Sequence, residues 1–105
     1  LSIDDALQTA DVLITGEGRM DEQTAMGKAP VGIAQRAKRQ NPKAAAIAFC
    51  GCALPGAIAV NDHGIDAYFP ILHQPGTVEE AMKPDVTERN LRQTALQVLR
   101  LLNIR

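Results

Sequence analysis

The residues best suited to chemistry lie close together near the start of the chain, in the stretch TGEGRMDEQTAMGKAP (residues 15–30). Glu17 and Asp21 supply carboxylates that can hold Mg²⁺ or accept a proton from a hydroxyl group. Arg19 can make bidentate contacts to a phosphate or a carboxylate. Lys28 lies at the expected start of a helix, where anions are favoured. Together these residue types suit phosphoryl transfer, in which positioning and charge neutralisation supply most of the catalysis.

Three glycines in this stretch allow backbone amides to approach a ligand closely, and a threonine can support the site by hydrogen bonding. We therefore predict two groups of site residues. The catalytic group is Asp21, Arg19 and Lys28. The group that binds substrate or phosphate is Gly16, Glu17, Gly18, Thr24 and Gly27, with Glu17 and Asp21 also predicted as metal ligands.

Each of these residues also has a purely structural interpretation. Arg19 can pair with Glu17 or Asp21 on the surface, and Asp21 can cap the turn that contains Thr24. The glycines can serve turn geometry alone. The spacing matches neither a Walker A motif nor a dinucleotide-binding fingerprint, so the residue types alone indicate only a loose constellation.

A parallel sheet is expected to position this stretch. Three apolar runs predict strands, at residues 11–15, 44–50 and 67–72. The site would then be a loop, Gly16–Gly27, at the carboxyl end of the first strand, where open α/β sheets bind ligands.

Helices are expected between and after the strands. They are predicted at residues 2–9, 28–39 and 55–62, and two more are predicted to open at the capping boxes Thr77–Glu80 and Asp85–Glu88. In the last helix, apolar residues recur at helical spacing: Leu91, Ala95, Val98, Leu99 and Leu102. The alternation predicts an α/β fold with a parallel sheet and flanking helices in three layers. Three strands are few for such a sheet, so we expect an incomplete part of a larger two-domain fold.

Composition excludes several classes of partner. The chain has 105 residues and a formal net charge of −1, which favours neither nucleic acid nor membrane binding. The basic run at residues 36–43 is interpreted as a solvated helix end. Cys50 and Cys52 are too close for an unstrained disulfide, so both are expected to be reduced, as in the cytoplasm. His63 is expected to end a helix, and His73 to follow the third strand.

The residue string at 15–37, TGEGRMDEQTAMGKAPVGIAQRA, resembles the signature of the bacterial type I glycerate kinases. In that family a strand ends in TGEGR and is followed by D-x-Q-T and GK-x-P-x-G-x-A. Gly64–Ala67 and Phe69–Ile71 are similar to a GIDA-x-F-x-I segment of the family, and the last helix is similar as well. The Cys50-Gly51-Cys52 segment departs from the family pattern.

This resemblance implies an enzyme that uses ATP and Mg²⁺ to phosphorylate D-glycerate, giving a phosphoglycerate, with 2-phosphoglycerate as the product of type I members. Family members are several times longer and place the active site between two α/β domains. Residues 1–105 resemble one α/β segment at the carboxyl-terminal end of such a protein, and the segment is expected to be inactive alone. The alternative is a non-catalytic module that binds an anion or a nucleotide. A shortened sheet also has an exposed edge, which would favour self-association.

Overall fold

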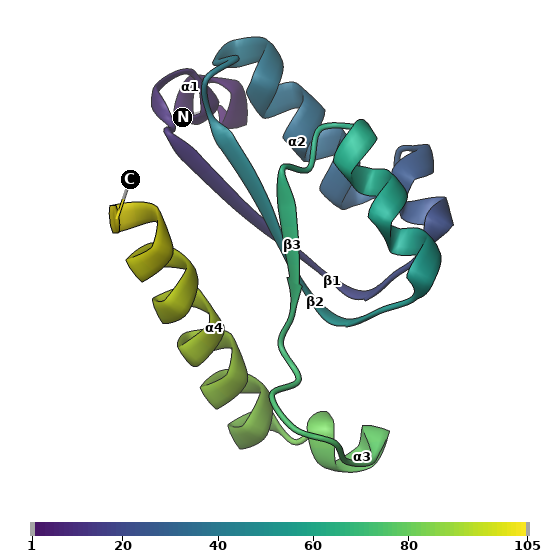
Figure 1. Cartoon of the computed structure of the whole chain (residues 1–105). Coiled ribbons are helices and arrows are strands. Elements are labelled where there is room, and N and C mark those ends of the chain that lie inside the picture. The colour runs from purple at the N-terminus through teal and green to yellow at the C-terminus, as the bar shows by residue number, and fades with distance from the viewer. Residues whose placement is uncertain (1, 105) are drawn as a thin grey trace. The chain divides into compact units, whose positions relative to one another are not determined.

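The computed structural model describes residues 2–104 and divides the chain into two units, the first ending at Pro70 and the second beginning at Ile71 (Figure 1). The first unit contains two α-helices, three strands and two 3₁₀ helices, η1 and η2. In chain order these are α1 (Ile3–Thr9), β1 (Val12–Met20), η1 (Glu22–Met26), α2 (Ala29–Gln40), β2 (Ala45–Ala53), η2 (Pro55–Asp62) and β3 (Ala67–Pro70). The second unit contains α3 (Val78–Ala81) and α4 (Pro84–Ile104).

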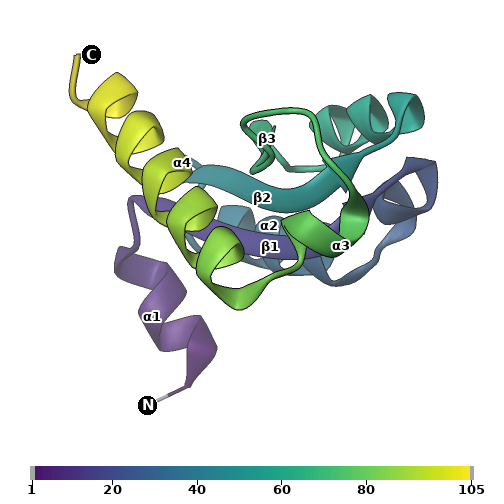
Figure 2. The same ribbon diagram turned by 90° about the horizontal axis from the view of Figure 1, so that it is seen from below.

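The three strands form one parallel sheet in the order β1-β2-β3 (Figure 2). The β1–β2 pairing runs from Val12 opposite Ala45 to Met20 opposite Ala53. The predicted α/β fold with a parallel sheet is thereby confirmed. The β1 and β3 strands form the two edges of this sheet, and their carboxyl ends point in the same direction.

The first strand continues well beyond its predicted end, and the prediction of a loop from Gly16 onward is wrong for this part. β1 extends to Met20, so the GEGR segment is paired, with Glu17 opposite Cys50 and Arg19 opposite Cys52. Glycine has a low strand propensity, but the ladder with β2 supplies backbone hydrogen bonds that override it. Only η1 and the residues beside it remain as a connection between β1 and α2.

The helices of the first unit follow their predicted signals closely. Ser2 caps α1 by accepting a hydrogen bond from the amide of Asp5, at 3.2 Å. The α2 helix lies within one residue of its predicted bounds. The segment at 55–62 is helical as predicted, although it is a 3₁₀ rather than an α-helix. Arg36 of α2 ties α1 in place through bonds of 2.5 and 3.0 Å to the carboxylate of Asp4.

The second unit confirms the Thr77 cap of the first predicted capping box and corrects the second box. Thr77 accepts a hydrogen bond from the amide of Glu80 at 3.1 Å, as predicted. The α4 helix, however, begins at Pro84, so Asp85 lies inside its first turn and is not the cap. Proline is well suited to the first helical position, because its fixed φ is helical and its missing N–H is not needed there.

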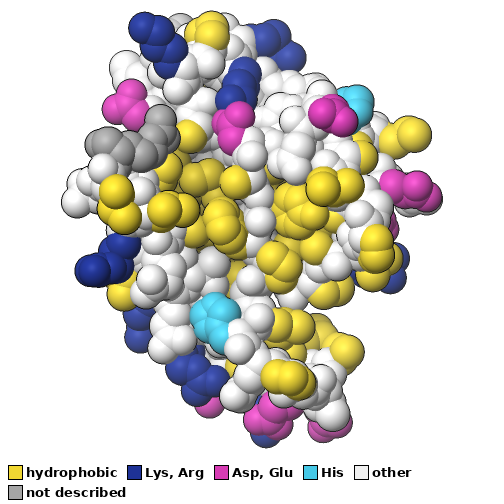
Figure 3. Space-filling model, in the orientation of Figure 1, with side chains coloured by type: hydrophobic (Ala, Val, Ile, Leu, Met, Phe, Trp, Pro, Cys, Tyr) yellow, Lys and Arg dark blue, Asp and Glu magenta, His cyan; other side chains and the backbone are white. Residues whose placement is uncertain are grey.

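The buried side of α4 is more polar than the apolar spacing of the helix suggests. The buried residues are Asn90, Thr94 and Val98, whereas Leu91 and Leu99 are 41% and 51% exposed. The apolar spacing identified the helix correctly, and of the five apolar residues only Val98 is buried. Hydrophobic side chains reach the surface elsewhere too, and on the face in Figure 3 most acidic and basic side chains lie toward the margin of the view. None of the helices within residues 2–104 combines the length and the apolar character needed to cross a membrane.

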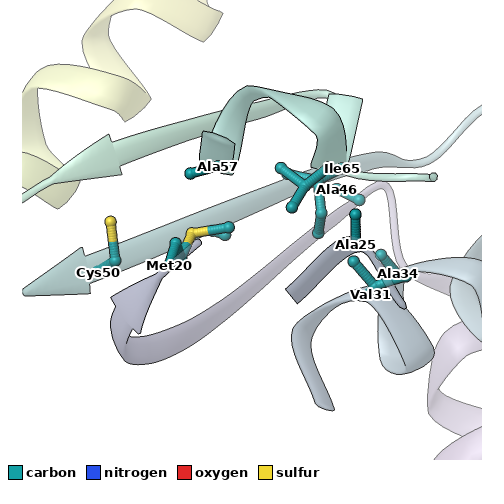
Figure 4. Packing of buried hydrophobic residues seen from close by; sticks show 10 residues of the cluster. Met20, Ala25, Val31, Ala34, Ala46, Cys50, Ala57 and Ile65 are labelled. Atoms are coloured by element: carbon teal, nitrogen blue, oxygen red, sulfur yellow. The ribbon is translucent and has the colours of Figure 1, made fainter. Parts of the chain in front are cut away.

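The core of the first unit lies on one face of the sheet. Ala46, Ala48 and Cys50 alternate along β2 and so point to the same face. The core is rich in alanine and is contributed by the sheet, by α2, η1 and η2, and by the connection from η2 to β3 (Figure 4): Met20, Ala25, Val31, Ala34, Ala46, Ala48, Cys50, Ala57, Val60 and Ile65. Alanine on the sheet lets the helices approach closely. The predicted third layer, on the opposite face, stays a prediction.

Asp66 joins α2 to the amino end of β2. One of its carboxylate oxygens accepts hydrogen bonds from Lys38 Nζ at 2.5 Å and from the amide of Ala46 at 2.8 Å. Partial burial by itself would raise the pKa of Asp66, but these two hydrogen bonds and the Lys38 charge outweigh it and lower the pKa below its ordinary value. The carboxylate is therefore favoured in the folded state.

We expect this carboxylate to make stability depend on pH. Because the folded-state pKa of Asp66 lies below its unfolded value, its contribution is present above about pH 4 and is lost as the pH falls through the folded-state pKa. Urea unfolding between pH 2 and 7 should show a smaller loss on acidification for Asp66→Asn than for the native chain. Asp62→Asn is the control, since the Asp62 carboxylate makes no hydrogen bond or ion pair within residues 2–104. If the free energy of unfolding of Asp66→Asn fell as much on acidification as that of the native chain, the proposed role of the Asp66 carboxylate would be contradicted.

The β1 and β2 backbones approach each other so closely near their carboxyl ends that only glycine fits at position 51. A Cβ atom on Gly51 would lie 2.6 Å from the carbonyl oxygen of Gly18, which requires the backbone to shift.

Gly51→Ala should therefore lower the free energy of unfolding by about 1–3 kcal/mol, the usual cost of overpacking. The control is Gly32→Ala in α2, where a Cβ meets only Gly27 O at 3.9 Å. That change should stabilise the chain by roughly 0.5–1 kcal/mol, because alanine is the better helix former. Urea denaturation measures both effects, and equal effects of the two substitutions would contradict the close approach.

Candidate functional site

A buried threonine connects the two carboxylate-bearing segments of the site. Thr24 is fully buried, and its hydroxyl donates to Glu17 Oε2 at 3.0 Å. The same hydroxyl oxygen accepts from the amide of Asp21 at 3.1 Å. Thr24 thus holds Glu17 on β1 and the backbone of Asp21 at the start of η1 in a fixed relation. The expected supporting role of Thr24 is a hydrogen-bonding role of this kind.

Asp21 caps η1 and is largely sheltered from solvent. Its Oδ1 accepts from the amide of Gln23 at 3.0 Å, and its other oxygen lies 3.7 Å from a guanidinium nitrogen of Arg19. The side chain of Asp21 is 15% exposed and that of Arg19 is 66% exposed. The capping and pairing interpretations of these residues are therefore both present in the structure. The pair is long and solvated, so it leaves the guanidinium able to reorient toward an anion.

The remaining predicted residues lie along the same segment. Gly16 and Gly18 are exposed positions of β1. Gly27 ends η1 with a φ of 97°, a left-handed conformation that glycine adopts without strain. Lys28 is the exposed residue that precedes α2, and its side chain makes no capping hydrogen bond. The structure thus joins Glu17, Asp21 and Thr24 by direct contacts and places Lys28 at the far end of the segment.

Sequence reasoning missed the contribution of the β2 carboxyl end. Glu17 is paired with Cys50, and the amide of Leu54 donates to the carbonyl of Met20 at 2.9 Å. A Cβ on Gly56 would lie 3.0 Å from Glu22 Cβ, so η2 also packs tightly on η1. Gly51 is the sequence signal that could have indicated the role of β2, because a glycine next to a predicted strand often marks a close approach of two backbones.

The thiol and imidazole groups are not part of this cluster. Burial, with smaller effects of Cys52 and Glu17, raises the pKa of the Cys50 thiol to about 11, so it is protonated at neutral pH. Both cysteines are free, in agreement with the prediction that they are reduced. His63 ends η2 as expected. His73 lies in the second unit, where its Nε2 is 2.8 Å from the hydroxyl oxygen of Thr94.

The two acids suit a magnesium ion that is shared with a substrate. Within residues 2–104, no group of three or more potential ligands among His, Cys, Asp and Glu is close enough to hold a metal. Mg²⁺ is commonly held by one or two carboxylates together with water and substrate phosphates. Glu17 and Asp21 each use one oxygen in a hydrogen bond to the protein, and both keep acceptor capacity. This donor chemistry is compatible with Mg²⁺, and the role of Glu17 and Asp21 as metal ligands stays a prediction.

The Thr24 hydroxyl should be required for this geometry. Thr24→Val keeps the shape but removes both hydrogen bonds, and it should cost about 1–3 kcal/mol of stability. Thr24→Ser keeps the hydroxyl and is the matched control. Hydrogen exchange of the Asp21 amide, followed by NMR, separates the two: protection should persist in Thr24→Ser and fall in Thr24→Val. Equal protection in the two variants would contradict the network.

Comparison with known proteins places this geometry in a family. Residues 1–103 match the glycerate kinase family. A glycerate kinase of Haemophilus influenzae is 48% identical over 102 residues, which are 97% of this chain and 26% of that protein. A glycerate kinase of Bacillus cereus is 48% identical over 97 residues, 92% of this chain and 24% of that protein. A glycerate 2-kinase of Escherichia coli is 37% identical over 83 residues, 79% of this chain and 21% of that protein. The chain thus spans about a quarter of the length of these relatives, and it belongs to the glycerate kinase family.

Proposed function

We propose that this chain is the carboxyl-terminal α/β segment of an enzyme that phosphorylates D-glycerate with ATP. The observation that carries the proposal is the family match over residues 1–103. The relatives are named glycerate kinases, and the Escherichia coli relative is named a glycerate 2-kinase, which favours 2-phosphoglycerate as the product. Because the chain spans only about a quarter of such a protein, we expect no turnover from it alone.

The local geometry supports a division of roles. Asp21 accepts the proton of the attacking hydroxyl while that oxygen forms a bond to the γ-phosphorus of ATP and the bond to the leaving ADP oxygen breaks. Arg19 and Lys28 contact phosphate or carboxylate oxygens, and the exposed glycines leave room for such a ligand to approach the backbone. Glu17 and Asp21 are the carboxylates that would hold Mg²⁺, which neutralises phosphate charge when it is bound.

The anchoring of the acids is what makes these roles physically reasonable. Glu17 is fixed by the Thr24 hydroxyl, and Asp21 is fixed by the Gln23 amide. A base that is already oriented loses little entropy when the substrate arrives. Arg19 and Lys28 are exposed instead, which suits groups that close onto a charged ligand.

A chimera tests the function directly. Residues 1–103 would replace the matching segment of the Haemophilus influenzae glycerate kinase, and transfer from ATP to D-glycerate would be followed by ³¹P NMR, which also identifies the phosphorylated hydroxyl. We expect the chimera to be active, and Asp21→Asn to lower kcat by about 10²-fold or more.

Glu22→Gln is the matched control, because Glu22 is the neighbouring exposed acid and takes no part in the Thr24 network. It should stay within about threefold of the chimera. A folded chimera that binds ATP without transfer would favour the binding-module alternative. Near-normal turnover of Asp21→Asn would remove Asp21 from the mechanism.

A further inference from the structure

The second unit contains a cavity that the proposed function does not use. It has a volume of about 370 Å³, which lies within the size range of small-molecule sites. All of its walls come from residues 72–93. They belong to the connection of residues 71–77 that precedes α3, to α3 itself and to the first turns of α4. The polar side chains that line it are those of His73, Gln74, Thr77, Glu80, Arg89, Asn90 and Gln93.

Asn90 gives the clearest indication that the cavity receives a ligand. The residue is only 6% exposed, yet its side chain makes no hydrogen bond within residues 2–104. It also lines the cavity, and no fully buried side-chain polar atom of the described chain is left without a partner. The Asn90 carboxamide therefore keeps its polar atoms accessible from the cavity. The carboxamide can therefore exchange hydrogen bonds with water for hydrogen bonds with a ligand that enters the cavity.

The charges around the cavity favour an anion. Glu80 is neutralised by Lys83, whose Nζ lies 2.9 Å from its carboxylate. Arg89 also lines the cavity, and it makes neither a hydrogen bond nor an ion pair within residues 2–104. The nearest ion pair of α4, between Arg92 and Glu88, leaves Arg89 uninvolved. An unpaired guanidinium beside an unbonded carboxamide presents several donors and one net positive charge.

The opposite wall is fixed by hydrogen bonds within the unit. His73 is held by its contact with Thr94 Oγ1, and the Thr77 hydroxyl accepts from the amide of Glu80. The Thr77 hydroxyl can still donate its own proton into the cavity. These contacts hold the 71–77 connection in place relative to α3 and α4, so the cavity is largely preformed.

We propose that this cavity binds a small organic anion through its carboxylate or phosphate oxygens. Arg89 makes the charged contact, Asn90 donates a second hydrogen bond, and Thr77 and Gln93 contact hydroxyl or ester oxygens of the ligand. The inference stands on the second unit alone and does not rest on the proposed kinase activity.

An NMR titration of the 105-residue chain tests the site. The probes are inorganic phosphate and, separately, sodium acetate, each compared with sodium chloride at equal ionic strength. We expect saturable shifts of the Asn90 and Gln93 side-chain amides and of the Thr77 backbone amide. Shifts with phosphate alone would identify a phosphate ligand, shifts with acetate alone a carboxylate ligand, and shifts with both an anion of either kind.

Substitutions decide whether the binding is specific. Arg89→Gln should raise Kd by about tenfold or more, since it removes a charged hydrogen bond. Arg100→Gln is the control, because Arg100 is an exposed arginine of the same helix outside the cavity lining, and Kd should stay within about twofold. Asn90→Ala should also raise Kd. If Asn90→Ala does not fold, the effect of Arg89→Gln on Kd tests the proposal by itself. Absent shifts, shifts scattered over the chain, or equal weakening by the two arginine substitutions would overturn the proposal.

Discussion

The hydroxyl of Thr24 is the point on which the candidate catalytic site depends. A polar group without solvent access has to be hydrogen-bonded, and this one is satisfied by Glu17 on one side and by the Asp21 amide on the other. The Glu17 side chain on β1 and the start of η1 are thereby held together. The acids are oriented by the fold itself, and no ligand is needed to place them.

Small residues make this arrangement possible. Gly51 allows β2 to reach the Gly18 carbonyl, and Gly56 allows η2 to reach Glu22. The alanines of the core have the same effect on the helices, which approach the sheet closely. Close packing of this kind leaves little room for adjustment, because protein interiors respond to the addition of even one methyl group. The position of Glu17 is therefore coupled to residues of β2 that never touch it through a side chain.

Features that depend on neighbouring residues in the chain, such as helix caps, could be predicted from the sequence. Features that depend on the pairing of distant strands could not. The Ser2 and Thr77 caps were identified correctly, because a cap is read from residues three apart. The end of β1 was not, since the GEGR segment has the composition of a loop and becomes a strand only through its ladder with β2. The same reason explains α4: spacing identifies a helix, but the burial of Asn90 and Thr94 depends on tertiary contacts. The cavity of the second unit could not be predicted from the sequence, because its walls come from several elements whose packing the sequence does not reveal.

The acids of the candidate site are held by hydrogen bonds, whereas its cations are exposed, and this difference indicates which part of an active site the chain could supply. Glu17 and Asp21 already have protein partners, whereas Arg19 is mostly exposed and Lys28 has no capping contact. Exposed cations are strongly hydrated, so their attraction for phosphate is weak until water is excluded. Nothing on β1 or η1 supplies that exclusion, since both face solvent at Gly16, Gly18 and Met26. The segment thus contributes preorganised acids, and the proposed role of its cations requires a surface that covers them and excludes water.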